Sequence, residues 1–205
     1  MNQDQRINTI THLFATCLAV FGGAFLIVQS ALTKDAYVIV AMSIYSASLI
    51  LLFFASTLHH SFPASTLLKT LDYTSIFLLI GGTFTPFLLV YSRTPIGWTL
   101  FGSVWLLLLI GFFLRLFYSH LPKYITSTIY LTLGWFGFFL YLIIEQSLML
   151  IQQVGIIAGG IFYTVGFLFF AFERPNTRQF GFHEIWHVFV IFGALAHYIA
   201  IFFIL

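Results

Sequence analysis

The sequence predicts an all-α integral membrane protein with seven transmembrane helices. Of its 205 residues, 60% are hydrophobic, 20% are aromatic and only 7% are charged, whereas a soluble domain carries about 25% charged residues. Its mean hydropathy is +1.03. Short polar segments divide the chain into seven apolar stretches, each close to the ~20 residues that cross a bilayer core. The formal net charge of +2 is too small and too scattered to predict a nucleic-acid partner.

Each expected span is bounded by a segment that contains charged, proline or serine residues. In order, these boundaries are T-K-D (33–35), S-F-P-A-S (61–65), S-R-T-P (92–95), S-H-L-P-K (119–123), E-Q-S (145–147) and E-R-P-N-T-R-Q-F-G (173–181). The spans are therefore expected at about 9–32, 37–60, 71–91, 96–117, 124–144, 148–172 and 183–205. These short loops have no room for a second folded unit, so residues 1–205 are expected to form a single domain.

The distribution of basic residues predicts how the chain is oriented in the membrane. Two of them, Lys34 and Arg93, lie on the side opposite the N-terminus. Six lie on the side of the N-terminus: Arg6, Lys69, Arg115, Lys123, Arg174 and Arg178. Short loops rich in Lys and Arg stay in the cytoplasm. The sequence therefore predicts a cytoplasmic N-terminus and a C-terminus outside.

Ionisable side chains gather toward the cytoplasmic end of these spans. His197 lies deeper, about 15 Å along its helix from His187. The others are His12, His59, His60, His120, His183 and His187, together with Asp72 at the start of the third span. Ionisable groups within a membrane are costly and usually pair or line a functional cavity. Their shared side and depth therefore favour a common site.

The spacing of these residues favours a metal site. His183 and His187 are four residues apart, as are Ser56 and His60, and residues so spaced share one helix face. Two histidines from one helix and a third from another supply the three nitrogen ligands of a catalytic zinc site, which keeps its fourth position for water. A carboxylate such as Asp72 could orient or deprotonate that water, or hold a ligand histidine. The only cysteine is Cys17, which excludes a zinc cluster built on several cysteines.

Simpler roles are also compatible with these residues. His12, His59 and His120 could sit at the membrane interface with a wet polar edge, and the pair on the last span could make hydrogen bonds between helices. Asp72 could cap the start of its span. Ser56 could bond to its own helix backbone.

Four stretches of the chain resemble the bacterial hemolysin III proteins, part of the progestin and adipoQ receptor superfamily. They are N-T-I-T-H at 8–12, S-T-L-H-H at 56–60, L-D-Y-T-S-I-F-L-L-I-G-G-T-F-T-P-F at 71–87, and H-E-I-W-H-V-F-V at 183–190 with His197 downstream. The resemblance runs nearly end to end. It implies a bacterial plasma-membrane protein that binds Zn²⁺ near the cytoplasmic side through His60, His183 and His187, with Ser56 and Asp72 near the metal-bound water.

His59 and Glu184 lie within these stretches but are not expected to bind the metal or to act as its main base. His59 stands where relatives often have tyrosine, and the four-residue spacing from Ser56 selects His60 instead. Residues 183 to 187 also spell H-E-x-x-H, the signature of helical zinc hydrolases. The family pattern needs no glutamate at the second position, so Glu184 is a less favoured general base than Asp72.

The resemblance implies several functions. Distant kinship with alkaline ceramidases implies hydrolysis of an amide or ester bond in a membrane lipid that enters from the cytoplasmic leaflet. The alternative is a non-enzymatic receptor or membrane-homeostasis protein with structural zinc. A pore-forming cytolysin is less expected, because a pore needs a polar stripe along several spans, and spans 96–117 and 124–144 have almost none. An intramembrane protease would need a further acidic ligand on a later helix, whereas His183 lies on the last span.

Overall fold

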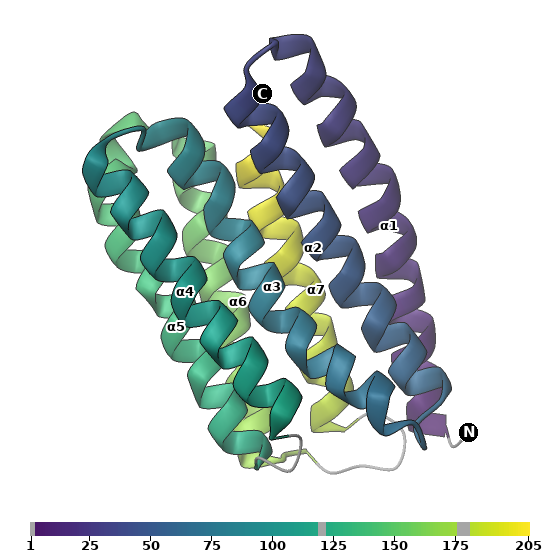
Figure 1. Cartoon of the computed structure of the whole chain (residues 1–205). Coiled ribbons are helices and arrows are strands. Elements are labelled where there is room, and N and C mark those ends of the chain that lie inside the picture. Colours follow the sequence, from purple (N-terminus) through teal and green to yellow (C-terminus); the bar gives the residue numbers. More distant parts are fainter. Residues whose placement is uncertain (1–2, 119–121, 176–180) are drawn as a thin grey trace.

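The computed structural model describes residues 3–118, 122–175 and 181–205, and these residues form seven long α-helices without a β-strand (Figure 1). All seven are long and apolar enough to cross a membrane. The predicted all-α class and the seven predicted spans are therefore confirmed. The helices are α1 (Gln3–Thr33), α2 (Ala36–Ser61), α3 (Thr66–Tyr91), α4 (Pro95–Phe117), α5 (Lys123–Ile144), α6 (Leu150–Phe172) and α7 (Phe182–Phe202), with a short 3-10 helix at Glu145–Ser147.

Two helices begin earlier than the apolar pattern predicts. Helix α1 starts at Gln3 rather than near residue 9, so its first two turns are polar. Helix α3 starts at Thr66 rather than at residue 71, because the hydroxyl of Ser65 accepts a hydrogen bond from the backbone N–H of Leu68 at 3.3 Å. Ser65 is therefore the N-cap, and the alternative that Asp72 caps this helix is wrong.

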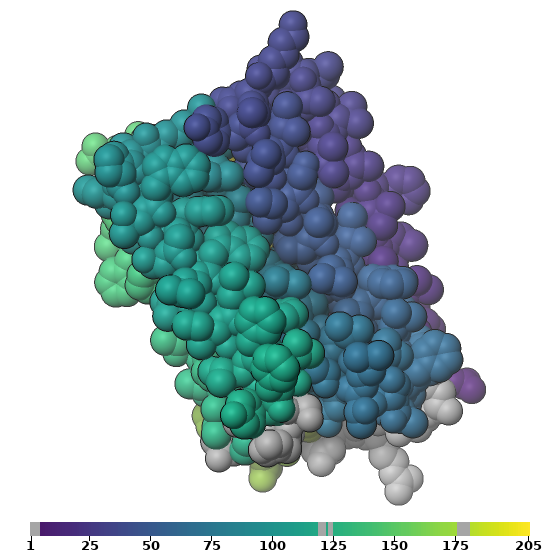
Figure 2. Space-filling view, viewed as in Figure 1, coloured from purple at the N-terminus to yellow at the C-terminus, as the bar shows by residue number. Residues whose placement is uncertain are grey.

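Helices α2 and α3 form the centre of the bundle. In the most apolar part of each helix, 67% of the residues of α3 and 56% of those of α2 are buried, against 22% in α4, α5 and α6. The centre is closely packed: a Cβ added to Gly82 of α3 would overlap the Ser48 hydroxyl of α2. Large apolar side chains such as Phe21, Phe117 and Leu150 remain exposed, as suits a surface that faces lipid. Figure 2 shows the face that side chains of α2, α3 and α4 cover.

The two ends of the bundle differ in their polar groups. At the end opposite the N-terminus, Arg93 donates to the carboxylate of Asp35 at 2.6 Å and stacks over the Tyr37 ring at 4.5 Å. The guanidinium group holds the pKa of Asp35 below its usual value. At the other end, the start of α1 lies near the end of α2 and the start of α7 (Figure 1).

Candidate metal centre

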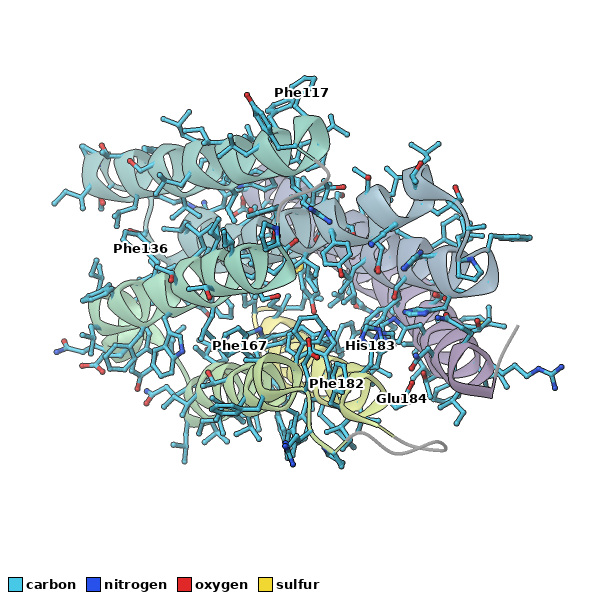
Figure 3. All side chains as sticks on the ribbon, turned by 90° about the horizontal axis from the view of Figure 1, so that it is seen from below. Phe117, Phe136, Phe167, Phe182, His183 and Glu184 are labelled. Atoms are coloured by element: carbon cyan, nitrogen blue, oxygen red, sulfur yellow. The ribbon has the colours of Figure 1, made fainter. Side chains whose placement is uncertain are left out.

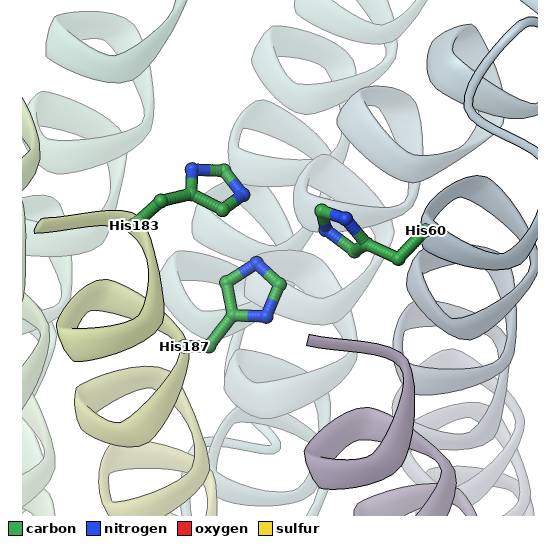
Figure 4. A group of neighbouring side chains, drawn as sticks. All are labelled: His60, His183 and His187. Carbon is green, nitrogen blue, oxygen red and sulfur yellow. The ribbon is translucent and has the colours of Figure 1, made fainter. Parts of the chain in front are cut away.

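Three histidines from two helices come together at the end of the bundle that carries the N-terminus. His60 lies in the last turn of α2, and His183 and His187 lie in the first turns of α7. Each offers a ring nitrogen, and these atoms all lie within 4.8 Å of one another. The ring centroids are 4.6 to 5.3 Å apart, and the rings face a common point (Figure 4). We call these three residues the histidine cluster.

The cluster has the properties of a metal site. Nε2 of His60 and Nδ1 of His187 are buried and have no hydrogen-bond partner among the described residues. An unsatisfied buried polar atom costs about 1–3 kcal/mol, so a ligand that binds Nε2 of His60 would stabilise the fold. Imidazole nitrogens suit divalent transition metals such as zinc. The residues present therefore fit a metal ion.

Asp72 and Ser56 lie on the neighbouring helices α3 and α2. The side chain of Ser56 interacts with the carboxyl group of Asp72 and makes no hydrogen bond to the backbone of its own helix within the described chain. Both residues line the same cavity as His183 and His187. The structure thus brings all five predicted site residues to one end of the bundle.

The remaining histidines at this end differ from one another. His12 was predicted at the interface, but it is only 3% exposed, and its ring contacts that of His187 at a centroid distance of 3.9 Å and an interplanar angle of 35°. The interface prediction is therefore wrong for His12. His59 lies beside His60, with 5.0 Å between ring centroids, but outside the three-histidine group. His120 lies outside the described residues.

Glu184 has a structural role that the H-E-x-x-H pattern does not indicate. Its Oε1 accepts a hydrogen bond from the side-chain amide of Asn8 at 2.9 Å, and its Oε2 accepts one from the backbone N–H of Gly181 at 2.8 Å. Both carboxylate oxygens are therefore engaged, one in joining α7 to α1 and one in capping α7. Viewed from this end, Glu184 lies on the side of α7 that faces α1 (Figure 3). It does not line the cavity next to the histidine cluster.

A cavity of about 410 Å³ extends from the histidine cluster into the bundle. Helices α1, α2, α3, α5, α6 and α7 contribute to its walls, which are mainly apolar, and Phe84, Phe138 and Phe167 are among the lining residues. Its polar groups near the cluster include Ser56 and Asp72. His197 lines the cavity about 15 Å farther along α7, and its Nε2 lies 3.2 Å from the carbonyl oxygen of Ile156. This volume is within the usual range of ligand sites.

Comparison with known proteins identifies the family. The family model described as "Haemolysin-III related" matches residues 2–198. The chain is 33% identical to Hemolysin-3 of Bacillus cereus, with 99% of this chain and 93% of that protein aligned. It is 31% identical to the Hemolysin-3 homolog of Bacillus subtilis (strain 168), over 98% and 94% of the two chains. It is 28% identical to the human Monocyte to macrophage differentiation factor, over 95% and 81%. The chain therefore belongs to the haemolysin-III related family, and it is a multi-pass membrane protein.

Proposed function

We propose that the chain is a zinc-dependent hydrolase that cleaves an amide or ester bond in a membrane lipid and so contributes to lipid homeostasis of the bacterial plasma membrane. The observation that carries this proposal is the position of the histidine cluster, because two of its members, His183 and His187, line the same apolar cavity as Asp72 and Ser56. Three imidazoles are the ligand set of known catalytic zinc sites. Magnesium and calcium prefer oxygen ligands, so they suit the cluster less well.

Asp72 and Ser56 supply the proton transfer that such a reaction needs. Zinc bound by the cluster would act as a Lewis acid that polarises water or the acyl carbonyl group. The Asp72 carboxylate accepts the proton of the attacking water, and the interaction with Ser56 holds that carboxylate in place. As the water oxygen bonds to the acyl carbon, the bond to the leaving amine or alcohol breaks. Asp72 then returns its proton to the leaving group.

The cavity suits a substrate that carries a long hydrocarbon chain. Its mainly apolar walls would bury the chain, while the bond to be cleaved lies among the polar groups at the cluster end. Six Lys and Arg residues are predicted on that same side of the membrane. The substrate would therefore enter from the cytoplasmic leaflet.

The test is Asp72→Asn in purified protein reconstituted in lipid, assayed against a panel of ceramide-like amides and acyl esters. The asparagine keeps the size of the side chain and most hydrogen bonds but cannot act as a base. We expect it to retain folding and zinc while hydrolysis falls by about 10²-fold or more. The His187→Ala protein provides the blank. If the unmodified protein is no more active than this blank across the panel, the hydrolase proposal is wrong, and a non-enzymatic protein with a structural metal is favoured instead.

A further inference from the structure

Gln5, in the first turns of α1, makes a hydrogen bond that determines which nitrogen of His60 can bind a metal. Its side-chain oxygen Oε1 lies 2.7 Å from Nδ1 of His60. An amide oxygen only accepts hydrogen bonds, so Nδ1 must carry the proton of the neutral imidazole. The lone pair is then on Nε2. This is the nitrogen of His60 that is buried and has no partner among the described residues.

The opposite arrangement would leave the site without a ligand atom. If Gln5 turned its amide nitrogen toward Nδ1, that nitrogen would donate, and the imidazole proton would move to Nε2. Nε2 has no acceptor within the described chain, and a protonated nitrogen cannot bind a metal. The unpartnered state of Nε2 and the short contact at Nδ1 therefore both support the tautomer of His60 that carries its proton on Nδ1.

Two other contacts hold α1 in place beside the cluster. Gln5, Asn8 and His12 follow one another at spacings of three and four residues, so they share one face of α1. Asn8 donates to Glu184, and the ring of His12 contacts the ring of His187. Since both contacts bind α1 to α7, the backbone position of Gln5 does not depend on its own bond to His60.

We propose that Gln5 is a positioning residue of the metal centre: it keeps the proton of His60 on Nδ1, orients the ring, and so presents Nε2 to the metal. This inference rests on metal binding by the histidine cluster, which is part of the proposed function, but it does not depend on hydrolysis. Partners of this kind, which bond to the second nitrogen of a ligand histidine, typically change metal affinity by about 10–100-fold when they are removed.

The first experiment measures zinc affinity of the full chain in lipid nanodiscs by competition with a chelator. Gln5→Leu removes the acceptor, and we expect it to weaken zinc binding by about 10–100-fold. Gln5→Glu keeps an acceptor and makes it more basic, so we expect affinity equal to or higher than that of the unmodified chain. Thr11→Val is the matched control: it removes a polar contact within α1 without touching a ligand histidine or the contacts between α1 and α7, and its affinity should stay close to normal.

The second experiment uses no metal. Nitrogen NMR of the zinc-free protein labelled at histidine, with His60→Gln to assign the signal, reports which nitrogen of His60 is protonated. We expect the Nδ1–H tautomer in the unmodified chain and a mixture of tautomers in Gln5→Leu.

Several results would overturn the assignment of Gln5. One is an Nε2–H tautomer in the unmodified chain, and another is unchanged zinc affinity in Gln5→Leu. Equal weakening in the Leu and Glu variants, or in Thr11→Val, would show that only the packing of α1 matters. An active metal site with none of the expected Gln5 effects would refute this inference alone, whereas an inactive protein with those effects would refute hydrolysis alone.

Discussion

Replacing Glu184 separates its structural role from the catalytic role that H-E-x-x-H would assign to it. Glu184→Ala leaves two buried donors, the Asn8 amide and the Gly181 N–H, without their acceptor. Hydrogen bonds to a charged group contribute about 1.5–3 kcal/mol each, so we expect a loss of about 3 kcal/mol or more in the free energy of unfolding. For a chain of this size, this corresponds to a fall in Tm of about 6–12 °C.

Glu184→Gln should be much milder for a reason that the structure provides. One oxygen of the new amide can still accept from Gly181, and its nitrogen can donate to Oδ1 of Asn8, which is buried and has no partner among the described residues. This requires only that the side-chain amide of Asn8 rotate so that its oxygen and nitrogen exchange places. The loss is then about 1 kcal/mol, from the missing negative charge at the start of α7.

The assay is thermal unfolding of both variants in lipid nanodiscs, with zinc content and hydrolysis measured on the same samples. We expect Glu184→Gln to keep its zinc and most of its activity. Two results would refute the reasoning. One is an equal fall in Tm for both variants, which would show that the contacts with Asn8 and Gly181 contribute little. The other is a stable, zinc-loaded Glu184→Gln protein without hydrolysis in an otherwise active system, which would make Glu184 the base.

Three further predictions concern the metal, the topology and the ion pair at the far end. Alanine at any one position of the histidine cluster should strongly reduce the zinc content measured by mass spectrometry, whereas His59→Ala should not. If His59→Ala loses as much zinc as His60→Ala, the assignment of His60 rather than His59 as the ligand is wrong. An enzyme reporter fused after Leu205 should be active only outside the cytoplasm, and activity inside would contradict the predicted orientation. Arg93→Ala should raise the pKa of Asp35 toward its usual value in an NMR titration, because the guanidinium group now lowers it. In the unmodified chain, this ion pair should stabilise the fold fully above the usual pKa of an aspartate, and its effect should be lost as the pH falls through the lowered pKa of Asp35. A titration curve of Asp35 that Arg93→Ala leaves unchanged would count against the contact.

The fold and the pairing of residues on one helix face could be predicted from the sequence because both depend on short-range patterns, whereas the family resemblance selected the group of three histidines that the structure brings together. Apolar stretches long enough to span a bilayer predicted the helices, and four-residue spacings placed Ser56 with His60 and His183 with His187. The early start of α1 could not be read in this way. Its first turns are polar, and hydropathy does not distinguish a polar helix end from a loop. The repeated spacing of Gln5, Asn8 and His12 was the available signal.

The polar partners of α1 could not be predicted, because they come from distant parts of the chain. His60 lies 55 residues from Gln5, and Glu184 lies 176 residues from Asn8. Local sequence contains no information about such pairs. The same limit applies to Glu184, whose place in a familiar motif suggested chemistry, whereas its contacts show that it joins two helices.

The residues of the candidate site come from helices at both ends of the chain, α1, α2 and α7, and this affects how the protein can fold during synthesis. During synthesis, α1 and α2 enter the membrane long before α7 leaves the ribosome. Until then, Asn8 lacks Glu184, and His60 lacks the two other members of its cluster. Unsatisfied polar groups within a membrane are costly. Insertion of α7 should therefore stabilise the packing of the helices as well as complete the site. Nascent chains that end before α7 should therefore lack the native packing of α1 and, under the proposed function, should bind zinc only after α7 has been inserted.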